Sequence, residues 1–251
     1  LSESPRTDLP VDYHLTKSGG NYVETDPHGT VRTFAGNPGG ILSVDRAGAR
    51  DETWTRDPNT DLLQKIVTTV GDGSQQTLTF SRDLDGRVTQ QDNILDDKLV
   101  RSVSYEYYAA GEANGAKGEV KTARVYEGTY DSVSEGVTQT NLLETKYYRY
   151  YDQGDANGYR GAYKYIFSDL ALQRMTGDGI AWQTADDTVV AAYADDYFEY
   201  DDQGRVTVRT TAAAGCSACA GGLGQFNYTY AINDSLTVND DLNLWRNKTE
   251  E

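Results

Sequence analysis

The feature that most constrains this chain is a short bend, Asp-x-x-Gly, set between two stretches of alternating side chains. In "YFEYDDQGRVTVRT" the bend runs from Asp201 to Gly204, and Phe198 and Tyr200 precede it on one face of an extended chain. Asp is favoured at the first position of a type I turn because its carboxylate accepts a nearby backbone N–H, and Gly is favoured at the fourth. The stretch therefore predicts a β-hairpin in which Gly204 has a positive φ.

The same outline recurs along the chain. "TFSRDLDGRVTQ" repeats it with Asp83 and Gly86, and "YVETDPHGTVRTF" repeats it with Asp26 and Gly29. Weaker copies lie at Asn37, Asp57, Tyr108, Asp152 and Ala231. Most copies are about 20 to 30 residues apart, which fits one hairpin per repeat, and we expect the two longest intervals, on either side of Asp152, to contain an additional strand pair.

A repeat this small cannot bury its own apolar face, so the hairpins should stack sideways into one continuous, curved sheet. Phe80 and Phe198 hold the same place in the repeat, and we expect both to be largely buried on one side of that sheet. A content of 19 Tyr and 25 Gly against 5 Pro and 1 Met also suits many short strands joined by turns. The fold class predicted is all-β, built from antiparallel hairpin repeats.

The 251 residues are enough for one large domain or two small ones, with a real core. We expect residues 1–20 to be a linker and residues 21–251 to form the repeat domain, as a fragment of a longer polypeptide. A formal charge of -16 argues against nucleic acid as a partner, because a phosphate binder needs a basic face. No apolar run reaches the length of about 18 residues that a membrane-spanning helix needs, so no membrane span is expected.

The outline aromatic-x-Tyr-Asp-x-x-Gly-Arg-Val/Leu resembles the tyrosine-aspartate (YD) repeat of the Rhs family, most clearly at residues 80–88 and 198–206. That family includes bacterial Rhs proteins, shell components of insecticidal toxin complexes, and the teneurins. The resemblance implies a long antiparallel ribbon that spirals into a hollow shell, often around a toxin or another cargo. It also implies that the partner is the remainder of the same polypeptide or the enclosed cargo. The chain is far shorter than a closed shell.

Cys216 and Cys219, in the Ala/Gly-rich "AGCSACAGG", are the only cysteines. We favour a short-range disulfide that pins this loop, as is natural for an exported protein. Unreactive free thiols are an alternative. A redox centre or a zinc site is a further one, although the first favours a helix start and the second needs two more ligands.

Other candidate sites are weaker. Acidic doublets and the segments "GEANG" (111–115) and "GDANG" (154–158) are typical of a solvated rim, with loose calcium binding as the alternative. His14 and His28 are too few for a hydrolase built around histidine, and His28 occupies a turn position where any polar residue would serve. We therefore expect no catalytic residue and no dedicated cofactor.

The function predicted is a non-catalytic shell or scaffold segment of a large exported bacterial YD-repeat protein, located outside the cell or at its surface. The alternative is an extracellular self-assembling or adhesive module, such as a filament subunit, which binds glycans or proteins through the tyrosine-rich faces of "YEYY" and "KYYRYYD". A glycan-active enzyme ranks last, because no residue pattern marks its site.

Overall fold

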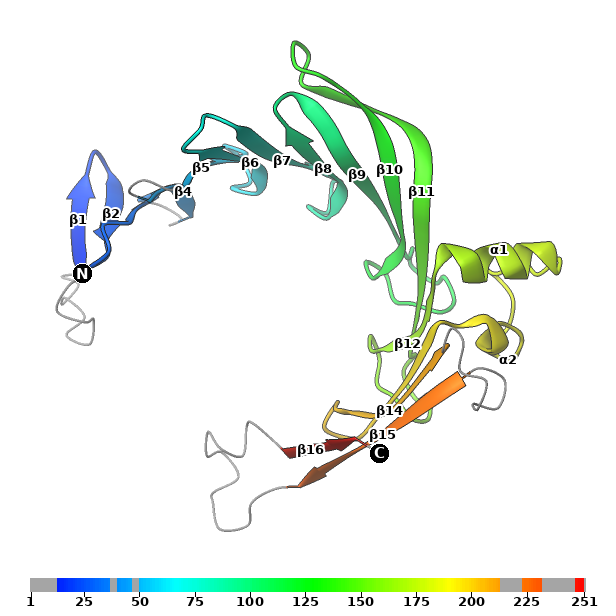
Figure 1. Cartoon of the computed structure of the whole chain (residues 1–251). Coiled ribbons are helices and arrows are strands. Elements are labelled where there is room, and N and C mark those ends of the chain that lie inside the picture. The colour runs from blue at the N-terminus through cyan, green and yellow to red at the C-terminus, as the bar shows by residue number, and fades with distance from the viewer. Residues whose placement is uncertain (1–12, 37–39, 47–49, 213–222, 232–246, 251) are drawn as a thin grey trace. The chain divides into compact units, whose positions relative to one another are not determined.

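The computed structural model describes residues 13–36, 40–46, 50–212, 223–231 and 247–250. Its strands follow one another in the sheet in the order of the chain, from β1 to β16, and each strand is hydrogen-bonded to the next (Figure 1). The hairpins are antiparallel, as the first and the later pairs both show. The predicted all-β fold of antiparallel hairpins is therefore confirmed.

The elements have the following bounds. The first eight strands are β1 (His14–Ser18), β2 (Asn21–Thr25), β3 (Val31–Phe34), β4 (Ile41–Asp45), β5 (Arg50–Arg56), β6 (Leu63–Val70), β7 (Gln75–Arg82) and β8 (Val88–Leu95). They are followed by β9 (Lys98–Tyr107), β10 (Val120–Asp131), β11 (Gly136–Tyr150), β12 (Tyr163–Phe167), α1 (Asp169–Gly177), α2 (Asp187–Val190), the short 3-10 helix η1 (Ala191–Tyr193), β13 (Asp196–Tyr200), β14 (Val206–Ala212), β15 (Leu223–Ala231) and β16 (Asn247–Glu250).

The chain divides into two compact units. Unit 1 comprises residues 1–104 and 125–143, and unit 2 comprises residues 105–124 and 144–251. Within unit 1, β1 lies in the segment that the sequence analysis assigned to a linker, and it pairs with β2 from His14 opposite Thr25 to Ser18 opposite Asn21. Residues 14–18 are thus part of the sheet.

Unit 1 is a sheet with little buried apolar surface. Among its described residues the buried apolar side chains are Val44 and Ile94. Small hydroxyl and β-branched side chains meet across neighbouring strands, as where Thr53 lies opposite Val67 and Thr77 opposite Ile94. Such cross-strand pairs and the backbone ladder stabilise a sheet locally. Unit 1 is therefore held together mainly by strand pairing and turns.

Unit 2 has an aromatic core beneath a helical segment, residues 168–195, which carries α1, α2 and η1 between β12 and β13 (Figure 1). The core cluster consists of Tyr108, Tyr147, Tyr150, Tyr165, Phe167, Ala171, Leu172, Met175, Val190 and Ala194. The sheet supplies the aromatic rings and the helical segment supplies most of the aliphatic side chains. The helical segment buries one face of this part of the sheet, as a β-sheet with an apolar face requires.

The two longest intervals between repeats contain no additional strand pair, so that expectation is wrong. The interval before Asp152 is filled by one hairpin of two long strands, β10 and β11. The interval after Asp152 is filled by β12, the helical segment and β13. The residues that the sequence analysis assigned to further strands instead lengthen β10 and β11 and form the helical segment.

Phe80 and Phe198 are half-buried, so they are less enclosed than the sequence analysis expected. The reason for Phe198 lies in the alternation of β13. Its neighbour Tyr197 pairs with Tyr165 and packs against the core, so Phe198 lies on the other face, where the guanidinium of Arg209 is 5.8 Å from its ring centre.

Candidate functional site: repeat turns, tyrosine loops and a buried arginine

The turn between β7 and β8 has the predicted geometry. Oδ1 of Asp83 accepts the backbone N–H of Asp85 at 3.0 Å and of Arg87 at 2.9 Å. The N–H of Gly86 donates to the carbonyl of Asp83 at 3.0 Å, and Gly86 has a φ of 81°. Asp thus replaces missing backbone partners inside the turn, and Gly supplies the left-handed conformation.

The turn between β13 and β14 repeats this arrangement. Oδ1 of Asp201 accepts the N–H of Gln203 at 3.0 Å and of Arg205 at 2.9 Å, and Gly204 has a φ of 74°. The guanidinium of Arg205 donates through Nε to Oδ2 of the same carboxylate at 2.5 Å. The positive φ predicted for Gly204 is therefore confirmed, and Gly86, at the same place in the repeat, shares it.

The Asp26 to Gly29 turn between β2 and β3 is a third copy with one substitution. Oδ1 of Asp26 accepts the N–H of His28 and of Thr30, and Gly29 has a φ of 80°. Thr30 stands where the other copies have Arg, and the carboxylate is bound instead by the guanidinium of Arg32 at 3.2 Å. Successive turns of a meander alternate between the two ends of the strands. The β2–β3 turn and the β7–β8 turn therefore lie at opposite ends of their strands.

The turn carboxylates are committed to the fold. Burial alone would raise the pKa of Asp83, but hydrogen bonds from the backbone and side chain of Arg87 lower it below the usual aspartate range. The same holds for Asp201, whose pKa is lowered by Arg205. Because turn N–H groups and a guanidinium occupy these oxygens, the repeat turns are structural elements of the sheet.

Two longer loops share one design. "YAAGEANGAKGEVK" (108–121) and "YDQGDANGYRGAYK" (151–164) have the same pattern, 43 residues apart, and we call them tyrosine loop 1 and tyrosine loop 2. Each folds over its first residue, Tyr108 or Tyr151, which is 1% exposed. The Tyr108 hydroxyl donates to the carbonyl of Tyr148 at 2.7 Å, and the Tyr151 hydroxyl donates to the carbonyl of Phe198 at 2.7 Å. Burial raises the pKa of both phenols, which therefore stay protonated as donors.

A glycine lets each loop cover its tyrosine. A Cβ at Gly115 would lie 2.3 Å from a ring carbon of Tyr108, and a Cβ at Gly158 would lie 2.3 Å from a ring carbon of Tyr151. No side chain fits at that distance, so both positions require the missing Cβ.

An asparagine in the left-handed region joins each loop to a strand further along the chain. Asn114 and Asn157 have φ values of 71° and 66°. The carbonyl of Asn114 accepts the N–H of Tyr150 at 2.9 Å, and that of Asn157 accepts the N–H of Tyr200 at 2.8 Å. The tyrosine loops therefore connect successive hairpins of unit 2.

One acidic residue of each loop is ion-paired to the lysine at the end of that loop. Lys121 contacts Glu112, and Lys164 contacts Asp155 at 3.3 Å. Both ammonium groups also lie over a tyrosine ring, 5.6 Å from the centre of Tyr108 and 5.0 Å from that of Tyr151. In the part of the chain that the structure describes, no three His, Cys, Asp or Glu side chains gather closely enough to hold a metal ion.

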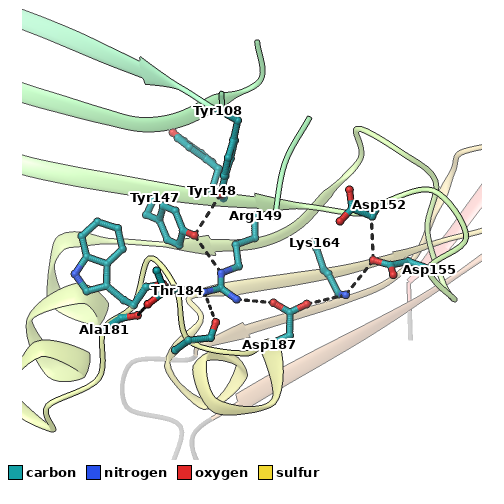
Figure 2. A network of polar contacts seen from close by, with 12 residues as sticks. Tyr108, Tyr147, Tyr148, Arg149, Asp152, Asp155, Lys164, Ala181, Thr184 and Asp187 are labelled. Atoms are coloured by element: carbon teal, nitrogen blue, oxygen red, sulfur yellow. Dashed lines mark hydrogen bonds and ion pairs between the residues drawn. The ribbon is translucent and has the colours of Figure 1, made fainter. Parts of the chain in front are cut away.

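Arg149 is the most buried charged residue among the described residues of unit 2, with a side chain that is 0% exposed. It reaches from β11 to the helical segment (Figure 2). Nη1 binds Oδ1 of Asp187 at 2.7 Å, and Nη2 donates to the carbonyls of Trp182 at 2.8 Å and Ala185 at 2.7 Å. Nε donates to the hydroxyl of Tyr147 at 3.2 Å. The guanidinium thus has the partners that a buried charge requires.

Asp187 joins this network to tyrosine loop 2. Its Oδ2 binds Nζ of Lys164 at 2.8 Å, so one carboxylate bridges two cations from the sheet (Figure 2). Burial would raise the pKa of Asp187, but hydrogen bonds and charge from Lys164 and Arg149 hold it below its usual range. The network anchors the helical segment to β11 and to the loop.

The sequence analysis missed this network, because only the strand register shows that Arg149, opposite Tyr165, lies on the covered face. A signal for the loops was present, since "GEANG" and "GDANG" resemble each other, but it was interpreted as an acidic rim or a calcium loop.

The remaining candidates fall outside these sites. Cys216 and Cys219 lie outside the described residues, so the disulfide stays a prediction. His14 is exposed on β1, and His28 is exposed within its turn. Among the described helices, none has the length and apolar character needed to cross a membrane.

Comparisons with known proteins give only distant structural likenesses. The chain matches no protein-family profile and no curated protein. It is similar to the crystal structures of TcdB2-TccC3-Cdc42 and TcdB2-TccC3, each with a TM-score of 0.39 and 16% identity over 87% of this chain. It is also similar to a porin-like protein from Bacteroides uniformis, with a TM-score of 0.32 and 14% identity over 62% of this chain and 74% of that one. This chain spans 12% of the length of the TcdB2-TccC3 chains that it matches.

Proposed function

We propose that this chain is a non-catalytic scaffold segment of a large exported bacterial protein of YD-repeat type, part of the wall of a shell. The observation that carries this proposal is the strictly sequential sheet, in which hairpin follows hairpin and the same Asp-x-x-Gly turn recurs at Asp26, Asp83 and Asp201. Such an architecture extends by adding hairpins and produces surface rather than a single enclosed pocket.

The chemistry of the buried polar groups supports a structural role. Arg149, Asp187 and Lys164 are bound to one another or to backbone carbonyls of the helical segment. A catalytic group needs an open position toward a substrate. The hydrogen bonds of these three groups are made within the fold and stabilise it.

The small number of buried apolar side chains in unit 1 is an argument for a partner, either another part of the same polypeptide or a cargo enclosed by it. Its described residues bury few apolar side chains, and isolated sheets are stabilised when another layer covers a face. In the proposed shell, neighbouring segments of the longer chain or the cargo would supply that layer. The extracellular or cell-surface location is part of this proposal and rests on the YD-repeat resemblance.

Light scattering and electron microscopy of the purified chain test the scaffold role. We expect a discrete particle with the monomer mass of 27.7 kDa and no release of reducing ends from neutral polysaccharides. A regular polymer on the microscope grid would favour the filament alternative instead. Steady hydrolysis of any polysaccharide would contradict the absence of catalysis, whereas sugar binding without hydrolysis would leave the scaffold role intact.

A further inference from the structure

A cleft of about 620 Å3 opens in unit 2 where tyrosine loop 2 lies beside the short β13–β14 turn. Its lining consists of Asn157, Gly158, Tyr159, Tyr200 and residues 201–204. The cause is a difference in length, because a four-residue turn cannot fill the space beside a loop of a dozen residues. The volume is within the range of about 300 to 1,000 Å3 that is common for small-molecule sites.

Two aromatic rings form a wall of this cleft. Tyr159 is 49% exposed, and its ring centre lies 5.4 Å from that of Tyr200 at an interplanar angle of 74°. Gly204 lets the rings approach the turn, since a Cβ there would lie 3.2 Å from Cε1 of Tyr159. An exposed aromatic face held in a fixed orientation is a surface on which an apolar ring face can stack.

Tyrosine loop 1 shows that the fold does not need this wall. At the place of Tyr159 it has Ala116, and at the place of Tyr200 it has Tyr150. The hydroxyl of Tyr150 donates to the carbonyl of Val120 at 2.8 Å, whereas the hydroxyl of Tyr200 makes no hydrogen bond to the described residues. The second copy therefore keeps the scaffold and adds an exposed ring and a free phenol hydroxyl.

The polar groups around the rings include both donors and acceptors. Asp201 is occupied by its own turn, but the exposed side chains of Asp202 and Gln203 make no hydrogen bonds within the part of the chain that is described. Burial and the neighbouring tyrosines Tyr159 and Tyr163 raise the pKa of Tyr200 to about 12, so its hydroxyl is a donor at neutral pH. A cation would use only the acceptors of this set, whereas a polyhydroxyl ligand uses the amide, the phenols and the carboxylate together.

We propose that this cleft binds a neutral oligosaccharide, with a sugar ring stacked on Tyr159 and its hydroxyl groups bonded to Gln203, Asp202 and Tyr200. The site goes beyond the scaffold role and does not depend on it. It gives one loop of a repeating wall a recognition surface that the sister loop lacks.

Nuclear magnetic resonance titration of the whole chain tests the proposal, with cellotetraose, maltotetraose and tetra-N-acetylchitotetraose as probes. We expect at least one probe to shift the amide signals of residues 157–159 and 200–204, with a millimolar or tighter dissociation constant. Tyr159→Ala should weaken that binding at least tenfold. This variant should fold normally, because it gives loop 2 the residue that loop 1 already has at that place.

Two further variants test which loop binds the sugar and whether the ligand is a sugar or a cation. Ala116→Tyr adds an aromatic residue to loop 1 and should leave the affinity unchanged, since Tyr150 there is already bonded. Asp202→Asn should keep most of the sugar binding, because an amide still donates and accepts. The proposal is overturned if none of the three probes binds at 10 millimolar (roughly the weak limit of useful affinity), or if Tyr159→Ala binds as the parent does. Binding of tetramethylammonium alone, lost in Asp202→Asn, would also overturn it and would identify a cation site.

Discussion

Units 1 and 2 are built from the same antiparallel hairpins, yet they differ in how many apolar side chains they bury. The buried apolar side chains among the described residues of unit 1 are Val44 and Ile94, whereas unit 2 has a cluster of tyrosines, Phe167 and aliphatic residues under the helical segment. The turns have the same chemistry in both units, as Asp83 and Asp201 show. Turn chemistry and strand pairing therefore make the hairpins, and a covering layer makes the core.

The largest effect that would test this comparison is expected at Arg149. Arg149→Met leaves the carbonyls of Trp182 and Ala185 and one oxygen of Asp187 without their buried donor, which should lower the unfolding free energy of unit 2 by about 3–5 kcal/mol. Hydrogen exchange read by mass spectrometry should show faster exchange across residues 168–195, while unit 1 strands such as β6 and β7 keep their protection.

The matched control is Arg209→Met. Arg209 pairs with Asp196 at 2.8 Å, but its side chain is 44% exposed, and exposed pairs contribute about 0–1 kcal/mol. If both variants lost the same stability, the arginine network would not be the anchor of the helical segment.

The next effect concerns the tyrosine loops of unit 2. Gly158→Ala places a methyl group 2.3 Å from the ring of Tyr151, so the loop must shift, at a cost of about 1–3 kcal/mol in urea unfolding. Gly177→Ala is the control, because a Cβ there meets no atom within 4 Å. Equal midpoints for the two variants would show that loop 2 is not closed over its tyrosine.

A smaller effect is expected in unit 1, where a turn rather than a core is changed. Gly86→Ala puts a side chain at a φ of 81° and 3.1 Å from Cδ1 of Leu62, which should cost about 1–2 kcal/mol. Gly71→Ala, in open space without a positive φ, should leave the unfolding midpoint within error. A loss in Gly71→Ala as large as that in Gly86→Ala would contradict a specific role for the Asp-x-x-Gly turn.

The smallest expected effect is the loss of stability in acid, and it should be similar in both units. The pKa values of Asp83 and Asp201 are lowered in the folded state, so the unfolded chain binds protons first as the pH falls through about 4. Stability from these carboxylates is therefore complete at neutral pH and is lost in acid. Asp83→Asn keeps an oxygen acceptor for the turn and should make the decline of the urea midpoint between pH 5 and pH 3 shallower. An unchanged decline would show that Asp83 does not contribute to it.

The hairpins and their turns could be predicted from the sequence because their causes are local. Asp83 and Gly86 are three residues apart, and the bonds that define the turn lie within five residues. The helical segment could not be predicted in this way. Its place depends on Arg149, which is a charged residue in a strand and whose partners Trp182, Ala185 and Asp187 are more than thirty residues away.

The cleft beside Tyr159 also could not be predicted from local sequence patterns. Its lining comes from two connections that are adjacent only because β11, β12, β13 and β14 pair in order. The alternative function assigned glycan binding to the tyrosine-rich faces of "YEYY" and "KYYRYYD". The tyrosines of "KYYRYYD" are largely buried, and the exposed ring at the cleft is Tyr159.

The sequential order of the strands also bears on how such a chain is made. Because each strand pairs with its neighbour in sequence, most hairpins can close as soon as their second strand has left the ribosome. The exception is β12, which must stay unpaired on one side until residues 168–195 and β13 have followed. The covered core of unit 2 therefore cannot form until residues 168–195 have been made.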